Sequence, residues 1–246
     1  MKYVLKFILA LLLVFGTKTF SQTCGFGCLG LSGFYGGFTY QNFEPTGLNN
    51  HLTDLAQQFA ETSEKINFSS GKGFRIGANI FRAQFDSYFL TAKGYYQFIK
   101  EEKSISSFNS QKASQFKSTL EFNHWGLGVD FGIPISSVFN WKIIEGGVSF
   151  YTTDLVNEYE LVDNSRLEDK FEQGDINVGY YIGTGLIVHI IKDFLSIEGT
   201  AAYNKVTIDD LIDANGNLLL GENSNASFLD KGNFSATLQL NFGVPL

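Results

Sequence analysis

The C-terminal segment carries the pattern that recurs along the chain. From Phe234 to Val244 every second residue is apolar, and the residues between them are polar or small. A period of two is typical of a β-strand with one apolar and one polar face. At roughly eleven residues the segment is longer than a common globular strand, and about as long as a tilted strand that crosses a bilayer. It therefore predicts a membrane-spanning strand.

Seven further segments show the same alternation, which gives eight predicted strands. In one of them Trp125, Leu127 and Val129 share a face, while His124 and Asp130 lie on the other. The segment that contains Glu145 is the least regular. The seven segments are 34–41, 73–80, 88–98, 124–133, 144–151, 177–190 and 195–204.

The connections between these segments alternate in length. Short links alternating with long loops are typical of outer-membrane barrels, which have tight periplasmic turns and long external loops. An even strand count places both ends of the barrel on the short-turn side. The long connections are 42–70, 100–118, 152–175 and 207–231, and the short ones are near 82–87, 134–140 and 191–194.

Lipid offers no hydrogen bonds, so strands in a bilayer must close into a barrel without free edges. The predicted fold is all-β: an eight-stranded antiparallel up-and-down transmembrane β-barrel with long external loops and short periplasmic turns. Its inward faces carry many glycines and also charged side chains of both signs. Such charges must pair in a narrow interior. We therefore predict a charge network in the lumen formed by Arg75, Lys93, Asp130, Glu145 and Glu198.

The N-terminus has the features of a secretory signal. Two lysines precede the apolar run 7–15, and small residues at Thr19 and Ser21 precede a cleavage site before Gln22. The apolar run is about half the length of a spanning helix, which disfavours a retained anchor. The predicted organisation is a signal peptide at 1–21, a linker at 22–30 and the barrel at 31–246.

Cys24 and Cys28 lie in the linker. In an exported chain this close pair predicts a small local disulfide. A metal site lacks further ligands at suitable spacing, and the residues before Cys24 do not form a lipoprotein cleavage box.

Composition narrows the functional classes. The 246 residues carry a net charge of −7, so the chain has no basic footprint for nucleic acid. The chain has 25 Phe and 11 Tyr, and a set of aromatic residues lies toward the segment ends: Phe34, Tyr40, Tyr88, Tyr96, Phe98, Trp125, Trp141, Tyr203, Phe234 and Phe242. This placement predicts aromatic girdles at two membrane interfaces, with an ordinary aromatic core as the alternative.

The first and last long loops contain local patterns. The first predicts a helix folded over the barrel rim, with a lid or partner-binding element as the functional alternative. The last resembles a calcium loop around Asp213, but Gly216 comes too early and the closing Glu is missing, so an Asn-Gly turn is favoured. The helical pattern comprises Leu48, Leu52, Leu55 and Phe59, with Thr46 or Asn49 as its cap.

The sequence assigns no catalytic, cofactor-binding or metal-binding residues. His51 looks solvated, whereas His124 and His189 fall on inward faces. An enzyme would require such a histidine to meet a carboxylate or serine near the outer rim, which spacing alone does not show.

The alternating segments, the loop asymmetry and the charged interior together resemble the small outer-membrane β-barrel proteins of diderm bacteria, of the OmpA transmembrane domain and OmpX-like, porin-like type. This resemblance implies a location in the cell outer membrane and contact with outer-membrane lipid and lipopolysaccharide. It also implies recognition of the last strand by the barrel-assembly machinery. That strand usually ends on an aromatic residue, whereas this chain ends in Gly243-Val244-Pro245-Leu246.

The predicted function is that of a non-enzymatic integral barrel with a structural or surface-interaction role through its external loops. One alternative is a lipid-modifying or hydrolytic enzyme of the outer membrane. Others are a narrow pore and a soluble lipocalin-like binder of apolar ligands. The lipocalin-like arrangement would turn the apolar faces inward and the charged faces outward.

Overall fold

A computed structural model describes residues 32–60, 65–106, 113–192, 194–220 and 227–243. The predicted signal peptide, Cys24, Cys28 and the last three residues lie outside these ranges. Among the described residues, no helix is long and apolar enough to cross a membrane.

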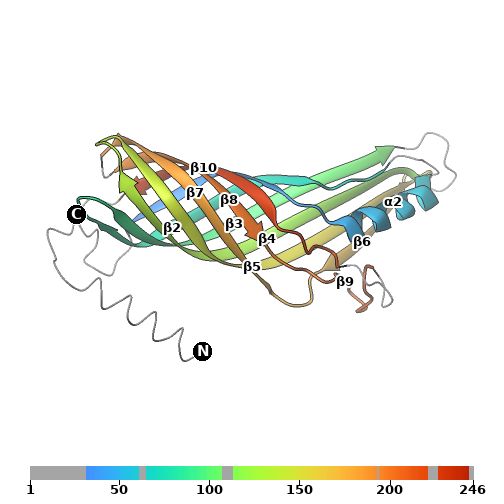
Figure 1. Cartoon of the computed structure of the whole chain (residues 1–246). Coiled ribbons are helices and arrows are strands. Elements are labelled where there is room, and N and C mark those ends of the chain that lie inside the picture. Colours follow the sequence, from blue (N-terminus) through green and yellow to red (C-terminus); the bar gives the residue numbers. More distant parts are fainter. Residues whose placement is uncertain (1–31, 61–64, 107–112, 193, 221–226, 244–246) are drawn as a thin grey trace, which may run out of the picture.

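Eight strands form a closed antiparallel barrel (Figure 1). Each strand pairs with the next along the chain, and the first pairs with the last, with Phe34 opposite Phe242 and Phe38 opposite Leu238. The predicted eight-stranded up-and-down topology is therefore confirmed. The barrel strands are β1 (Gly33–Asn42), β2 (Ser70–Gln84), β3 (Phe89–Ser106), β4 (Ala113–Pro134), β5 (Phe139–Leu161), β7 (Asn177–Ile191), β8 (Leu195–Lys205) and β10 (Asn233–Gly243).

The two ends of the barrel differ as the loop lengths predicted. Turns at 85–88 and 135–138 lie at one end, where the short connection from β7 to β8 also lies. At the other end lie α2 (Thr46–Ala60), β6 (Arg166–Glu172) and β9 (Ile212–Asp213), next to the extended ends of β3, β4 and β5 (Figure 1). β6 pairs with β5, and β9 pairs with β6, so both extend the sheet outside the barrel.

An outward apolar belt surrounds the short-turn part of the barrel. Phe38 is 80% exposed, Trp125 65% and Leu238 60%. Alternate residues on the same strands point inward and are buried, as the period of two predicted. Further exposed members of the belt are Phe34, Ile76, Leu127, Val129, Val178, Ile182, Leu186, Phe234, Leu240 and Phe242.

Aromatic pairs lie at both edges of this belt. Toward the long-loop end, the rings of Tyr96 and Trp125 are 4.9 Å apart, and Tyr203 contacts Phe234. Near the short turns, Tyr88 stacks on Phe85 with 4.4 Å between the ring centroids. Rings at both levels are the arrangement expected of membrane-barrel girdles.

The polarity of the two strand faces inverts above the belt. On β4 the inward residues Phe116, Leu120 and Phe122 are apolar and buried. Outward residues at this level form ion pairs instead, such as Lys117 with Glu158 at 2.9 Å. The described residues 100–106 and 113–118 are thus strand, and so are 152–161, although 100–118 and 152–175 were predicted as loops. Apolar and polar residues still alternate there, but the apolar residues point inward and not outward. A search for strands with one continuous apolar face therefore misses these residues.

Above the belt, the chain packs around an apolar core like that of a water-soluble protein. We call this part of the molecule the cap. Its buried core joins helix α2, the long ends of β3 to β5 and residues of the segments 206–219 and 228–229. Leu48 and Leu52 of α2 are fully buried, and the helix contacts β3 and β4. The remaining core residues are Phe43, Ile66, Phe68, Ile99, Ile105, Phe116, Leu120, Phe122, Tyr151, Leu155, Tyr159, Val206, Ile208, Leu211, Leu219, Phe228 and Leu229.

Local hydrogen bonds hold the two loops that the sequence singled out. The helix begins at Thr46, so Asn49 lies inside it and is not its cap. The Asn49 side chain instead accepts a hydrogen bond from the Phe68 backbone N–H at 2.8 Å, which ties α2 to the returning chain. At Asp213, the carboxylate accepts backbone hydrogen bonds from Asn215 and Asn217. The predicted Asn-Gly turn is confirmed there, with Gly216 at a φ of 83°.

Tyrosine rings pack over glycines of neighbouring strands inside the barrel wall. Tyr35 lies opposite Gly77, and Tyr95 lies opposite Gly126. A Cβ on Gly126 would come within 2.1 Å of the Tyr95 ring, so only glycine leaves room for that ring. These aromatic–glycine pairs fill the interior without widening the barrel.

Candidate functional site

The predicted lumen charges come from five strands and all point inward. Arg75 is on β2, Lys93 on β3, Asp130 on β4, Glu145 on β5 and Glu198 on β8. All five side chains are buried. Their placement follows from the period of two, because each faces away from the apolar belt.

A sixth charge, Lys142, lies among them and was not predicted. Strict alternation from Glu145 would point Lys142 outward. The strand instead contains a β-bulge between Lys142 and Glu145, where Ile143 and Ile144 are both exposed. A bulge adds one residue and so resets the side on which the following side chains point. The adjacent apolar pair Ile143-Ile144 is the signal in the sequence.

Two lysines hold the three carboxylates together. Lys93 Nζ lies 2.9 Å from Asp130 Oδ1 and 3.1 Å from Glu145 Oε2. Lys142 Nζ is 2.5 Å from Glu145 Oε2 and 3.4 Å from Asp130 Oδ2. Lys142 also donates to Glu198, which accepts a further hydrogen bond from Asn241 at 3.1 Å.

These contacts explain how the like charges are tolerated. Asp130 and Glu145 stand directly opposite each other on neighbouring strands, an arrangement that is destabilising by itself. Lys93 and Lys142 each contact both of them. With Arg75 nearby, three buried cations balance three buried anions.

Arg75 lies apart from the carboxylates. Its Nε donates to Gln97 Oε1 at 2.6 Å, and its guanidinium carbon lies 4.3 Å from the centre of the Tyr95 ring. No carboxylate lies within 4 Å of the guanidinium in the part of the chain that the structure describes. Its charge is therefore held by an amide and a cation–π contact.

The carboxylates of Asp130, Glu145 and Glu198 have oxygens within 4.8 Å of one another, close enough to share a metal ion. The ammonium groups of Lys93 and Lys142 already contact these oxygens. These two ammonium groups compensate two of the three negative charges, and Arg75 is a third buried cation farther away, so the chemistry of the cluster suits a structural ion network.

A layer of tyrosine and histidine lies between this network and the aliphatic part of the cap core, and Tyr151 belongs to both the layer and the core. His124 is buried and stacks on Tyr151, with 4.3 Å between the ring centroids. Tyr95 meets the His124 ring edge-on and shares a hydrogen bond of 3.0 Å with Ser149. The lumen is thus filled in three successive layers: the ion network, the tyrosine–histidine layer and the apolar core of the cap.

The other two histidines lie at opposite ends of the molecule. His189 is near the short turns, with its Nε2 2.9 Å from Asn140 Nδ2. His51 lies on α2 and is half-buried, not solvated as predicted. This burial lowers the pKa of His51 below its usual value, because the charged imidazolium would be less well hydrated there than in water.

Neither a protein family nor a curated protein matches this sequence. Several solved structures are similar to it at low identity. Ail, the attachment invasion locus protein of Yersinia pestis, is 10% identical, with a TM-score of 0.42, covering 87% of this chain and 98% of its own. Neisserial surface protein A is 13% identical, with a TM-score of 0.42 and coverages of 87% and 99%. The outer membrane protease OmpT of Escherichia coli is 10% identical, with a TM-score of 0.42 and coverages of 92% and 99%.

Proposed function

We propose that this barrel is an integral outer-membrane protein with a closed lumen, which holds its cap outside the cell for a structural or surface-interaction role. The observation that carries the proposal is the inversion of polarity along the strands. Below the inversion, apolar side chains point outward and charges inward, which suits lipid around the barrel. Above it, ion pairs point outward around an apolar core, which suits water.

The dimensions and register of the belt support insertion in a bilayer. β10 has 11 residues, about the length that a tilted strand needs to cross the hydrocarbon region. A lipocalin-like binder would turn Leu238 and Val129 inward, but both are more than half exposed. Exposed apolar surface on this scale is unfavourable in water and favourable against acyl chains.

The filled lumen argues against a pore. A narrow eight-stranded barrel is expected to be packed with side chains. Here Lys142 and Glu145 are almost completely buried, and the cap core follows beyond the tyrosine–histidine layer. An ion crossing the barrel would have to displace all three layers.

The arrangement also favours a non-enzymatic role over a hydrolase. His124 lies inside the barrel between aromatic rings, and His189 is near the short turns. His51 lies at the cap end on α2, but among the described residues no hydrogen bond joins its ring to a serine or a carboxylate. A hydrolytic site at the outer rim requires a histidine there with an orienting group and an accessible nucleophile. We therefore propose that the cap binds its partners through its surface and does not act on them chemically.

Planar-bilayer recording tests the closed lumen. We expect no steady single-channel steps from the purified wild-type protein after insertion, with a general porin as positive control. The physical reason is that the ion network and the cap core occupy the whole cross-section. Steady, ohmic steps from the wild type would contradict this proposal and favour the pore alternative.

A further inference from the structure

We propose that the outward surface of β10 and β1 to β4 holds one phosphorylated, multiply acylated glycolipid of the outer leaflet. Its phosphate would lie on Lys72 and Lys100, and its acyl chains in two apolar grooves below them. This inference rests on the proposed membrane location and adds to it a specific lipid and a specific site.

The two lysines form a cationic pair at the outer edge of the belt. Lys72 and Lys100 stand directly opposite each other on β2 and β3. Like charges in this position repel, which favours an anion between them. Lys72 makes no ion pair with any residue in the described ranges, and Lys100 has one 3.3 Å contact with partly exposed Glu121. An exposed pair of this kind is weak and can yield to a phosphate.

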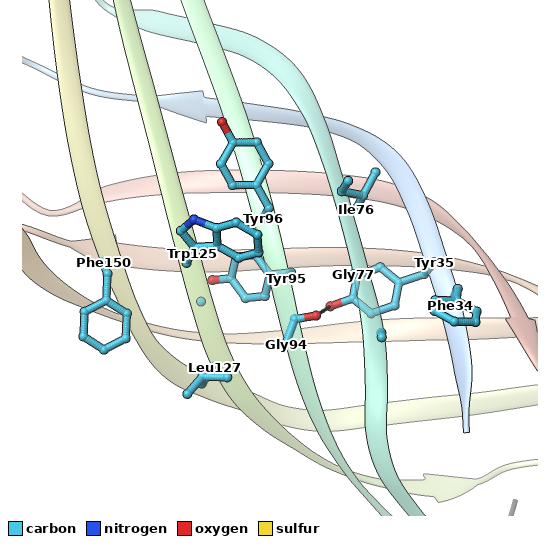
Figure 2. A pocket seen from close by; sticks show the side chains of 12 residues that line it. Phe34, Tyr35, Ile76, Gly77, Gly94, Tyr95, Tyr96, Trp125, Leu127 and Phe150 are labelled. Carbon is cyan, nitrogen blue, oxygen red and sulfur yellow. Dashed lines mark hydrogen bonds between the residues drawn. The ribbon is translucent and has the colours of Figure 1, made fainter. Parts of the chain in front are cut away.

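The larger groove lies on the outward face of the barrel (Figure 2). On β3 it begins at Tyr96, four residues before Lys100. It has a volume of about 810 Å³. Its floor is formed by Ala78 and Gly94, which stand opposite each other between larger neighbours. Tyr96, Trp125 and Leu127 rise beside the floor, as Figure 2 shows. The small residues leave a depression that an acyl chain can fill.

The polar and apolar parts are spaced as in a lipid. Along β3, the outward residues run from Lys100 through Phe98 and Tyr96 to Gly94. Four residues from Lys100 to Tyr96 correspond to about 13 Å of strand. A phosphate on the lysines would therefore let a chain pass the Phe98 ring and enter the groove.

A second groove, of about 380 Å³, favours a lipid with several acyl chains spread over a broad headgroup. It lies across β10, β1 and β2 and has Lys72 on its rim, with Ala236 as the small residue between Tyr40 and Leu238. The Phe38–Phe74 cross-strand pair separates the two grooves. A lipid that fills both must carry chains on either side of this ridge, which fits a broad, multiply acylated headgroup better than a two-chain phospholipid.

The test compares lipid A with phosphatidylglycerol, binding to the full mature protein in nanodiscs of zwitterionic lipid, by native mass spectrometry. We expect wild type to bind one lipid A with clear preference over phosphatidylglycerol. K72Q/K100Q should weaken lipid A binding by about 25-fold, roughly fivefold for each charge removed near the membrane surface. Gly94→Leu should weaken it by about tenfold or more, because the side chain occupies the groove.

Matched controls lie on β8, across the barrel from β3. K205Q removes an outward lysine, and Gly199→Leu adds a leucine where a Cβ meets no atom within 4 Å. Both should bind lipid A like the wild type. Unchanged binding in K72Q/K100Q, equal losses in the controls, or equal affinity of the wild type for phosphatidylglycerol would each overturn the site. Failure of the wild type to enter nanodiscs would instead overturn the membrane location on which the site depends.

Discussion

Replacing Lys142 by methionine is expected to lower the free energy of unfolding by about 3–5 kcal/mol, the usual cost of removing one partner from a buried charge cluster. Lys142 contacts Asp130, Glu145 and Glu198, and its side chain is fully buried. Without it, Lys93 alone must compensate two carboxylates that face each other across strands. Urea unfolding in lipid vesicles, followed by the heat-modifiable shift on gels, measures the change.

Two comparisons isolate the cause. Lys117→Met removes an ion-paired lysine from the exposed surface of β4 and should change the free energy of unfolding far less than Lys142→Met, because solvent screens that ion pair. Adding Glu198→Leu to the Lys142→Met variant should recover part of the loss, because an unpaired buried carboxylate is removed. If Lys142→Met costs no more than Lys117→Met, the network does not stabilise the barrel.

Phe116→Ala is expected to destabilise the cap by about 3–5 kcal/mol. The Phe116 ring is completely buried in the cap core and packs against the Tyr159 ring, with 5.0 Å between the ring centroids. Because this core lies beyond the apolar belt, the variant should make the cap sensitive to protease while the belt strands stay inserted. Limited proteolysis of the protein in vesicles, combined with urea unfolding, measures both effects.

Leu167→Ala is the matched control for the cap. Leu167 lies on β6 in the same part of the molecule, but it is 52% exposed. Its truncation leaves no buried cavity and should change stability by less than about 0.5 kcal/mol. Equal protease sensitivity of the Phe116→Ala and Leu167→Ala variants would show that the cap has no cooperative core.

The barrel could be predicted from the sequence because apolar and polar residues alternate with a period of two in all strands of the belt. Residues such as Leu127 and Leu238 alternate with inward glycines and polar residues, so the number of strands and their faces follow from the period of two. Inward placement of Lys93, Asp130, Glu145 and Glu198 follows from the same rule. Which of them make contact depends on register between strands, which the pattern of one strand does not contain.

Lys142 shows where this reasoning fails. A single bulge at Ile143-Ile144 moves Lys142 from the expected outer face to the centre of the charge cluster. Arg75 was expected to pair with a carboxylate, but Gln97 and Tyr95 are its contacts. Alternation identifies which side chains point inward, and only the three-dimensional register decides their partners.

The cap was missed for a different physical reason. Strands β3 to β5 continue beyond the belt, and apolar residues such as Leu120 and Leu155 then point inward. With the proposed membrane location, this is where the surroundings would change from lipid to water. When the apolar residues of a strand change from the outward to the inward face, the strand no longer has one continuous apolar face. Such a segment is then mistaken for a loop. The short helix of the first loop was recognisable, because Leu48 and Leu52 keep helical spacing.

The orientation of the belt can be measured directly with the two tryptophans of the chain, Trp125 and Trp141, which are both outward. Each would be studied alone in the W141F or W125F variant, in vesicles that contain lipids brominated on their acyl chains. The fluorescence of both should be quenched by the brominated chains and remain shielded from iodide in the aqueous phase. A tryptophan placed at Leu167 in a chain lacking both should show the reverse. Strong quenching of Trp125 and Trp141 by iodide, with none by brominated lipid, would mean that water and not hydrocarbon surrounds the apolar side chains.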